Sequence, residues 1–252
     1  MGQGGLTAMQ LVLPALTFRT PDGAIDTAAT VAYARRAAGT WAHRFILSGT
    51  TTGGHQASEA DRAAVVDLWA DTIGVDRLTA CCWTPADITH ATHAGVVPMV
   101  VLRDLANDAE ALSLFAALPR PSYLFSHPEF SPTTLTPELA AAARAAGVLP
   151  AAAKVSKVPP SGIAALRTAT GPDFTLWDGT ARHISASLDA GADGIVTAPL
   201  SHLPDPFPAT QADQLQAAID AAQHHLDTQT GRDARTAALF VMATAGHPSI
   251  GT

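Results

Sequence analysis

The sequence predicts an α/β protein, a closed (β/α)8 TIM barrel with helices added after the eighth strand. Eight short apolar segments recur along the chain, and a segment typical of a helix follows each of them. The length of 252 residues suits one such barrel, and no long linker or low-complexity tract interrupts the alternation. An open doubly wound sheet is the structural alternative, but no G-x-G-x-x-G segment follows the first strand.

The predicted strands are short and apolar, as expected for strands buried on both faces. They are expected at residues 9–18, 44–48, 78–83, 96–102, 123–126, 149–154, 174–178 and 194–198. Pro14 lies inside the first segment and favours an irregular or end position there, because proline cannot donate to a ladder. The barrel is expected to span about 9–202, and the whole chain, 1–252, is predicted to be a single domain.

The predicted helices have recognisable start signals. Asp26 or Thr27 can cap a helix that stops at Gly39, and Ser58 with Asp61 resembles a capping arrangement. Helices are expected near 27–38, 58–73, 87–94, 108–117, 137–146, 161–168 and 181–190, with C-terminal helices at about 209–245.

Composition excludes several classes of protein. The net charge is -7 and no Lys/Arg cluster is present, which argues against a nucleic-acid partner. The two cysteines, Cys81 and Cys82, are adjacent, so no disulfide framework exists and no metal-binding spacing is evident. The first ten residues lack a signal pattern, and no run of eighteen apolar residues occurs. We therefore expect a cytoplasmic protein with no membrane contact, no metal and no cofactor.

Lys154 is the first candidate for chemistry. The chain holds only two lysines, Lys154 and Lys157, against thirteen arginines. Lys154 ends an alanine-rich strand, where a desolvated amine can lose its proton and attack a carbonyl to form a Schiff base. Arginine cannot do this. The alternative is that Lys154 merely reaches for water at the end of a strand.

In a barrel of this type the active site forms at the C-terminal ends of the strands. Polar or aromatic residues expected there are Thr17, Ser48, Thr51, Thr52, Gly53, Trp83, Arg103, Ser126, His127, Ser156, Asp178 and Thr197. The loop Gly49–Gly54 offers hydroxyls and backbone N–H groups that could hold a carboxylate, although a plain turn is the alternative. An amine beside a carboxylate cradle suits a 2-oxo acid held as an iminium.

Several short motifs, in order and spacing, resemble the dihydrodipicolinate synthase/N-acetylneuraminate lyase family of class I, Schiff-base aldolases of the pyruvate type. These motifs are Pro14-Ala15-Leu16-Thr17-Phe18, Gly49-Thr50-Thr51-Thr52-Gly53, Phe125-Ser126-His127-Pro128, Ala151-Ala152-Ala153-Lys154, Trp177-Asp178-Gly179 and Gly191-Ala192-Asp193-Gly194-Ile195. The likeness covers about residues 12–202. It implies that Lys154 is the Schiff-base lysine, that the substrate is pyruvate or another 2-oxo acid or aldehyde, and that a C–C bond is cleaved or formed.

The departures from the family are also informative. The family's proton-relaying tyrosine falls at Phe125, which cannot exchange a proton. The family's second tyrosine, contributed by a neighbouring subunit, has no counterpart, and the glutamate of the carboxylate loop falls at Gly54. The C-terminal helical extension is shortened relative to the family. A standard dihydrodipicolinate synthase activity is therefore not expected. Family members tend to be tetramers, so a homo-oligomer is an expectation, which the missing tyrosine weakens.

Another group must then move protons. His127 and Ser126 share the end of the fifth strand with Phe125, and histidine titrates near neutral pH. Asp178 could orient the substrate or take a proton, and capping the next helix is the alternative. Substrate contacts are expected from Thr51, Thr52, Gly53, Phe125, Thr197 and Trp83, although Trp83 could equally be a packing residue.

Two other functions remain open at this point. One is a barrel enzyme that works without an imine, as an acid–base lyase, isomerase or cyclase. The other is a non-catalytic protein that binds small acids.

Overall fold

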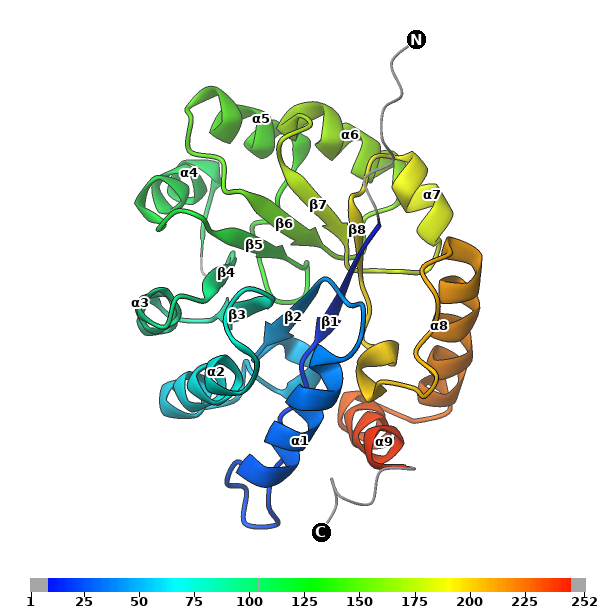
Figure 1. Ribbon diagram of the computed structural model, residues 1–252. Helices are drawn as coiled ribbons and strands as arrows, with labels where there is room; N and C mark the ends of the chain where they lie inside the picture. Colours follow the sequence, from blue (N-terminus) through cyan, green and yellow to red (C-terminus); the bar gives the residue numbers. More distant parts are fainter. Residues whose placement is uncertain (1–8, 104, 246–252) are drawn as a thin grey trace.

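The computed structural model describes residues 9–103 and 105–245, and residues 1–8, part of the segment without a signal pattern, lie outside them. Eight parallel strands form a closed barrel in chain order, with the eighth strand paired to the first. Helices surround this barrel (Figure 1). The strands are β1 (Gln10–Pro14), β2 (Arg44–Leu47), β3 (Leu78–Cys82), β4 (Val97–Val101), β5 (Tyr123–Ser126), β6 (Ala152–Val155), β7 (Thr175–Asp178) and β8 (Gly194–Val196). The predicted fold class is confirmed.

The helices alternate with the strands, and two further helices close the described chain. They are α1 (Thr27–Ala38), α2 (Glu59–Ile73), α3 (Pro85–His93), α4 (Asp108–Ala117), α5 (Pro137–Ala145), α6 (Pro160–Thr170), α7 (Ile184–Asp189), α8 (Ala212–Asp227) and α9 (Arg232–Thr244). Two 3-10 turns, η1 (Thr50–Thr52) and η2 (Pro199–His202), follow β2 and β8. Within the described residues, no helix is both long and apolar enough to cross a membrane.

Local signals place the ends of the first elements as expected. Pro14 is the last residue of β1. The Asp26 carboxylate accepts the N–H of Ala29 at the start of α1, and the Ser58 hydroxyl accepts the N–H of Asp61 at the start of α2. Side-chain caps of this kind satisfy backbone donors that the first helical turn leaves free, so the sequence alone can specify them.

The sixth strand begins later than predicted, at Ala152 rather than Leu149. The N–H groups of Val148 and Leu149 donate to the carbonyl of Ala143, so these residues complete the end of α5. Leu149 instead packs against the core from this turn. The first residues of the apolar run therefore belong to the end of α5 and the later ones to β6, and Lys154 lies inside β6 rather than at its end.

The seventh helix also begins later than predicted, at Ile184 rather than Ala181. Ala181 has a φ of 50°, a left-handed conformation that cannot begin an α-helix. The Asp178 carboxylate accepts the N–H groups of Thr180 and Ala181, which stabilises a turn before α7.

The buried side chains form two separate clusters. The larger one lies between strands and helices, and the smaller one fills the barrel interior. The interior cluster consists of Val12, Ile46, Cys81, Trp83, Met99, Val101, Phe125, Ala152, Trp177 and Val196. Because strand side chains alternate between faces, the face of any residue follows from its neighbours. Ala153 and Val155 belong to the outer cluster, so Lys154 points into the barrel.

The loop after β8 is held to the first helix and the last. The Tyr33 hydroxyl donates to the carbonyl of Ser201 over 2.7 Å, and Arg36 donates to the carbonyl of His202 over 2.6 Å. Helix α9 packs on η2 and lies beside it in Figure 1. The C-terminal helices therefore support the same end of the barrel as the strand-end loops.

Candidate active site

Lys154 places its amine at the centre of the candidate site. The side chain is only 9% exposed, and burial lowers the pKa of its amine to about 8. No acidic side chain pairs with it in the described part of the chain. Its Nζ atom lies 4.3 Å from the centre of the Phe125 ring, on the neighbouring strand. A ring face attracts a cation weakly, but the cost of desolvation is larger and favours the neutral amine.

The loop after β7 makes room for the lysine. A Cβ atom at Gly179 would lie 2.8 Å from Cε of Lys154 and 2.5 Å from Oγ of Ser156. Only glycine fits this position without a shift of its neighbours. The motif Trp177-Asp178-Gly179 alone does not predict this role, although a glycine directly after a strand signals a close approach.

A group of aromatic rings adjoins the amine through Phe125. We call Trp83, Phe125, Phe130, His55 and His127 the aromatic cluster. Phe125 and His127 stack with an interplanar angle of 8° and a centroid separation of 6.0 Å. Phe130 contacts three other members, at 5.3 Å from His55, 5.1 Å from His127 and 6.0 Å from Trp83. The sequence analysis missed Phe130, which lies in the loop after β5 without any local signal.

His127 is held as a neutral imidazole. Its Nδ1 atom accepts the backbone N–H of Glu129 over 3.1 Å, which leaves the proton of the neutral ring on Nε2. Burial, assisted by the nearby charge of Lys154, lowers the pKa of His127 to about 4. This differs from the expected titration near neutral pH. In this arrangement His127 is a hydrogen-bond donor through Nε2, and its lone pair is already occupied.

The structure does not bring Ser126 and Asp178 together with Lys154. Both pair in register with Val155, whose side chain belongs to the outer cluster, so both point away from the barrel interior. The Ser126 hydroxyl accepts the N–H of Leu135 over 3.0 Å. The Asp178 carboxylate accepts the N–H of Thr180 at 2.7 Å and the Ser187 hydroxyl at 2.8 Å. Their contacts shape the loops around the site.

The loop 49–54, which holds three threonines, contains the 3-10 turn η1 and is capped by Gly53, where φ is 71°. The Thr52 hydroxyl donates to the carbonyl of Gly49 within the same turn. The carbonyl of Thr51 accepts the hydroxyl of Thr236 over 3.3 Å, which ties this loop to α9. Thr51 therefore faces the C-terminal helices.

Gly54, which stands where the family has glutamate, cannot carry a side chain in this backbone. A Cβ atom there would lie 1.8 Å from the carbonyl oxygen of Ser48. The backbone of this loop therefore excludes the glutamate that the family motif would place at this position.

A buried ion pair fastens the loops after β2 and β3. Arg62 Nε donates to both oxygens of Asp87 over 2.9 and 3.0 Å, and each side chain is 6% exposed. Asp87 also accepts the N–H groups of Trp83 and Thr84. The Trp83 indole donates to the carbonyl of Ser48 over 3.0 Å. Trp83 is therefore held in one orientation as a wall of the aromatic cluster.

Thr197 and Cys81 are further buried polar groups. Thr197 follows β8, its N–H donates to the carbonyl of Val12, and its hydroxyl has no hydrogen-bond partner among the described residues. Cys81 lies in the interior cluster, and burial raises the pKa of its thiol to about 12. The thiol is therefore neutral and is no competing charge for Lys154. In the described ranges, no three His, Cys, Asp or Glu residues gather as metal ligands would.

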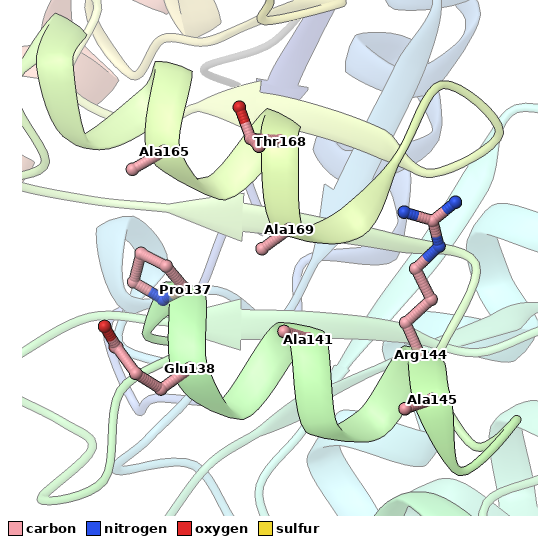
Figure 2. A pocket seen from close by; sticks show the side chains of 8 residues that line it. All are labelled: Pro137, Glu138, Ala141, Arg144, Ala145, Ala165, Thr168 and Ala169. Carbon is pink, nitrogen blue, oxygen red and sulfur yellow. The ribbon is translucent and has the colours of Figure 1, made fainter.

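A hollow of about 850 Å³ lies far from this chemistry, on the outer side of α5 and α6. Figure 2 shows its lining, with Ala141 and Ala169 between the two helices and Arg144 at one end. Half of its lining residues are alanine, and it holds no group of the candidate site.

Comparison with known proteins shows which solved structures share this fold. No family model and no curated protein matches the chain. Solved structures do match. The sialic acid aldolase of Ruminococcus gnavus, a catalytic lysine mutant, has a TM-score of 0.82 at 14% identity, covering 98% of this chain and 88% of its own. The 2-keto 3-deoxygluconate aldolase of Picrophilus torridus has a TM-score of 0.77 at 13% identity, covering 93% of each chain.

A third solved structure also matches. A prophage protein of the dihydrodipicolinic acid synthase family from E. coli K12, in complex with pyruvate, has a TM-score of 0.66 at 19% identity. It covers 94% of this chain and 79% of its own. The resemblance stated from the sequence motifs is thereby confirmed at the level of the fold, at identities of 13–19% to these structures.

Proposed function

We propose that the protein is a carbon–carbon lyase of the class I aldolase type, acting on pyruvate or another 2-oxo acid through a Schiff base on Lys154. One observation carries this proposal. The amine lies inside the barrel, desolvated and without an acidic partner in the described residues, and the pKa of Lys154 is lowered to about 8. A sizeable fraction of a nucleophilic neutral amine is then present near neutral pH. The fold shared with aldolases supports the proposal.

The first step follows from the chemistry of the amine. The lone pair of Lys154 Nζ attacks the C2 carbonyl carbon, and the carbonyl oxygen takes up a proton. The resulting carbinolamine loses water to give an iminium, which can accept the electron pair of a breaking C–C bond as an enamine. His127 supports this step as a donor, because its Nε2 proton can stabilise negative charge that develops on the carbonyl oxygen.

The site differs from that of a standard dihydrodipicolinate synthase. Phe125 occupies the place of the relaying tyrosine and offers no proton. Ser126 and Asp178 hold loops and point outward. Proton transfer after iminium formation is therefore assigned to water or to the substrate's own groups. The same observation favours a second candidate, a barrel that binds a 2-oxo acid without turnover. An imine-free acid–base enzyme has less support, since the predicted acid and bases do not converge.

Borohydride trapping tests the proposal, because the chain has only two lysines. The protein is reduced in the presence of pyruvate and other 2-oxo acids, and its intact mass and peptide map are measured. We expect an adduct at Lys154 whose mass equals the acid minus water plus two hydrogens. Lys154→Met removes the adduct, and the matched variant Lys157→Met keeps it, because Lys157 is exposed and paired with Glu129.

No adduct with any 2-oxo acid, under conditions that trap a control aldolase, would overturn the proposal. An adduct without cleavage or condensation of any 2-oxo acid would instead select the binding protein.

A further inference from the structure

A cavity of about 410 Å³ lies between the loops at the C-terminal end of the barrel and the turn from α8 to α9. Its volume is that of a small-molecule site. The residues of its lining that matter here are Thr51, Arg182, Ala198, Arg232, Arg235 and Thr236. They come from the loops after β2, β7 and β8 and from α9, so only the closed barrel brings them together.

The charge of this cavity is opposite to that of the protein. The whole chain carries a net charge of -7 and has fifteen basic residues, yet three arginines line this one cavity. Among the described residues of the lining, none is Asp or Glu. Guanidinium groups are planar forks that bind phosphate and carboxylate with two parallel hydrogen bonds. An arrangement of three such groups around a cavity favours an anion.

The arginines are only partly neutralised by neighbours. Arg182 lies 4.0 Å from Asp227, at the limit of an ion pair, and is 51% exposed. Arg232 donates to Glu129 over 3.0 Å and is 48% exposed. Arg235 forms no ion pair with any described residue. The hydroxyl of Thr236 is already committed to the carbonyl of Thr51, so the guanidinium groups are the main donors available to a ligand.

The cavity is linked to Lys154 by continuous contacts. The guanidinium carbon of Arg232 lies 4.9 Å from the centre of the Phe130 ring. Phe130 contacts His127, which stacks on Phe125, and the Phe125 ring lies beneath the Lys154 amine. The aromatic cluster therefore connects the amine with Arg232, so the cavity is placed for a group distant from the reacting carbonyl.

We propose that this cavity binds the phosphate or second carboxylate group of a small anionic molecule through Arg182, Arg232 and Arg235. The anion has two possible sources, the far end of the 2-oxo acid that condenses with Lys154 or a separate small ligand. Assignment to the substrate rests on the proposed function. Anion binding itself does not.

Calorimetric titration with inorganic phosphate, at constant ionic strength, tests the site. We expect saturable binding to the intact protein and a loss of affinity of roughly tenfold for each guanidinium removed in Arg182→Gln and Arg235→Gln. Arg35→Gln, which removes an exposed arginine of α1 outside the cavity, is the matched control and keeps the affinity. Absence of saturable binding, or equal weakening by Arg35→Gln, overturns the proposal.

Two further measurements separate the sources and the proposals. Borohydride trapping is measured with added inorganic phosphate, once for pyruvate and once for a 2-oxo acid that carries a terminal phosphate. If inorganic phosphate slows trapping of the phosphorylated acid but not of pyruvate, the cavity belongs to the substrate. If inorganic phosphate binds but slows neither trapping reaction, the cavity belongs to a separate ligand. Lys154→Met is expected to bind phosphate as the unaltered protein does. Retained phosphate binding without any lysine adduct would therefore refute the Schiff-base function and leave the anion site standing.

Discussion

Gly179 and Lys154 approach each other so closely that the Lys154 side chain keeps its position only because residue 179 has no side chain. The position of a Cβ atom on Gly179 is 2.8 Å from Cε of Lys154. The loop after β7 and the lysine of β6 are therefore fitted to one another, and the amine keeps its place over the Phe125 ring.

Gly179→Ala is expected to displace Lys154 and to destabilise the fold by about 1–3 kcal/mol, as overpacking of a buried site does. The rate of borohydride trapping should fall more than the stability loss explains. Urea denaturation and trapping kinetics measure the two effects. Gly39→Ala is the control, since its φ is −73° and it lies at the end of α1. Trapping at the original rate in Gly179→Ala would contradict the fit described here.

The trapping rate should rise with pH through about 8. The neutral amine is the nucleophile, and the pKa of Lys154 is lowered to about 8 by burial. An ordinary lysine would show this rise only near its usual pKa of about 10.4. Initial rates of adduct formation from about pH 6 to about pH 11 measure the inflection. A profile that keeps climbing past pH 10 would show an amine that is not desolvated.

The same pKa shift makes stability depend on pH. The amine is neutral in the folded state above about pH 8 but remains charged in the unfolded chain up to its ordinary pKa of 10.5. Between these values the unfolded state binds more protons, so the free energy of unfolding rises with pH. The total rise is on the order of 3 kcal/mol. Urea denaturation of the unaltered protein and of Lys154→Met measures it, and the variant should lack this component.

His127 should remain neutral down to about pH 4 with its proton on Nε2, because burial lowers its pKa and Nδ1 accepts the Glu129 N–H. Nitrogen chemical shifts of the imidazole report both the tautomer and the pKa. Exposed His224 on α8 is an internal reference. A His127 titration near pH 6.5, or a proton on Nδ1, would restore the role of proton shuttle expected from the sequence.

Breaking the buried pair of Arg62 and Asp87 should cost about 3–5 kcal/mol, because Arg62→Met leaves a buried carboxylate without its partner. The exposed pair of Arg19 and Asp61 provides the control, and Arg19→Met should cost less than about 1 kcal/mol. Denaturant unfolding measures both. Similar losses in the two variants would mean that Arg62 does not fasten the loops as its contacts indicate.

Much of the fold could be predicted because its signals are local. The carboxylate of Asp26 and the hydroxyl of Ser58 cap the helices that directly follow them. The wrong start of β6 came from a run of apolar residues whose first members complete α5 through Ala143. Apolar character alone does not distinguish a strand from the packed end of a helix.

The residues of the candidate site were predicted less completely than the fold. Lys154 and Phe125 were placed together by the family resemblance, and the structure pairs them in register on neighbouring strands, so they share a face. Ser126 and Asp178 are one residue out of phase with them, and this alternation could have been applied to the sequence. Phe130 and Arg232 could not be found in that way, because loops have no period and helix α9 is distant in sequence.

The alternation of apolar strands and helices determined the closed parallel barrel, and the scarcity of lysine singled out Lys154. Both are properties of the chain that hold before any long-range contact forms. Closure of the barrel decided the rest, including the dry surroundings that lower the pKa of Lys154, the close approach of Gly179, and the meeting of Arg182, Arg232 and Arg235. These depend on distances between segments far apart in the sequence, which only the packed three-dimensional arrangement defines.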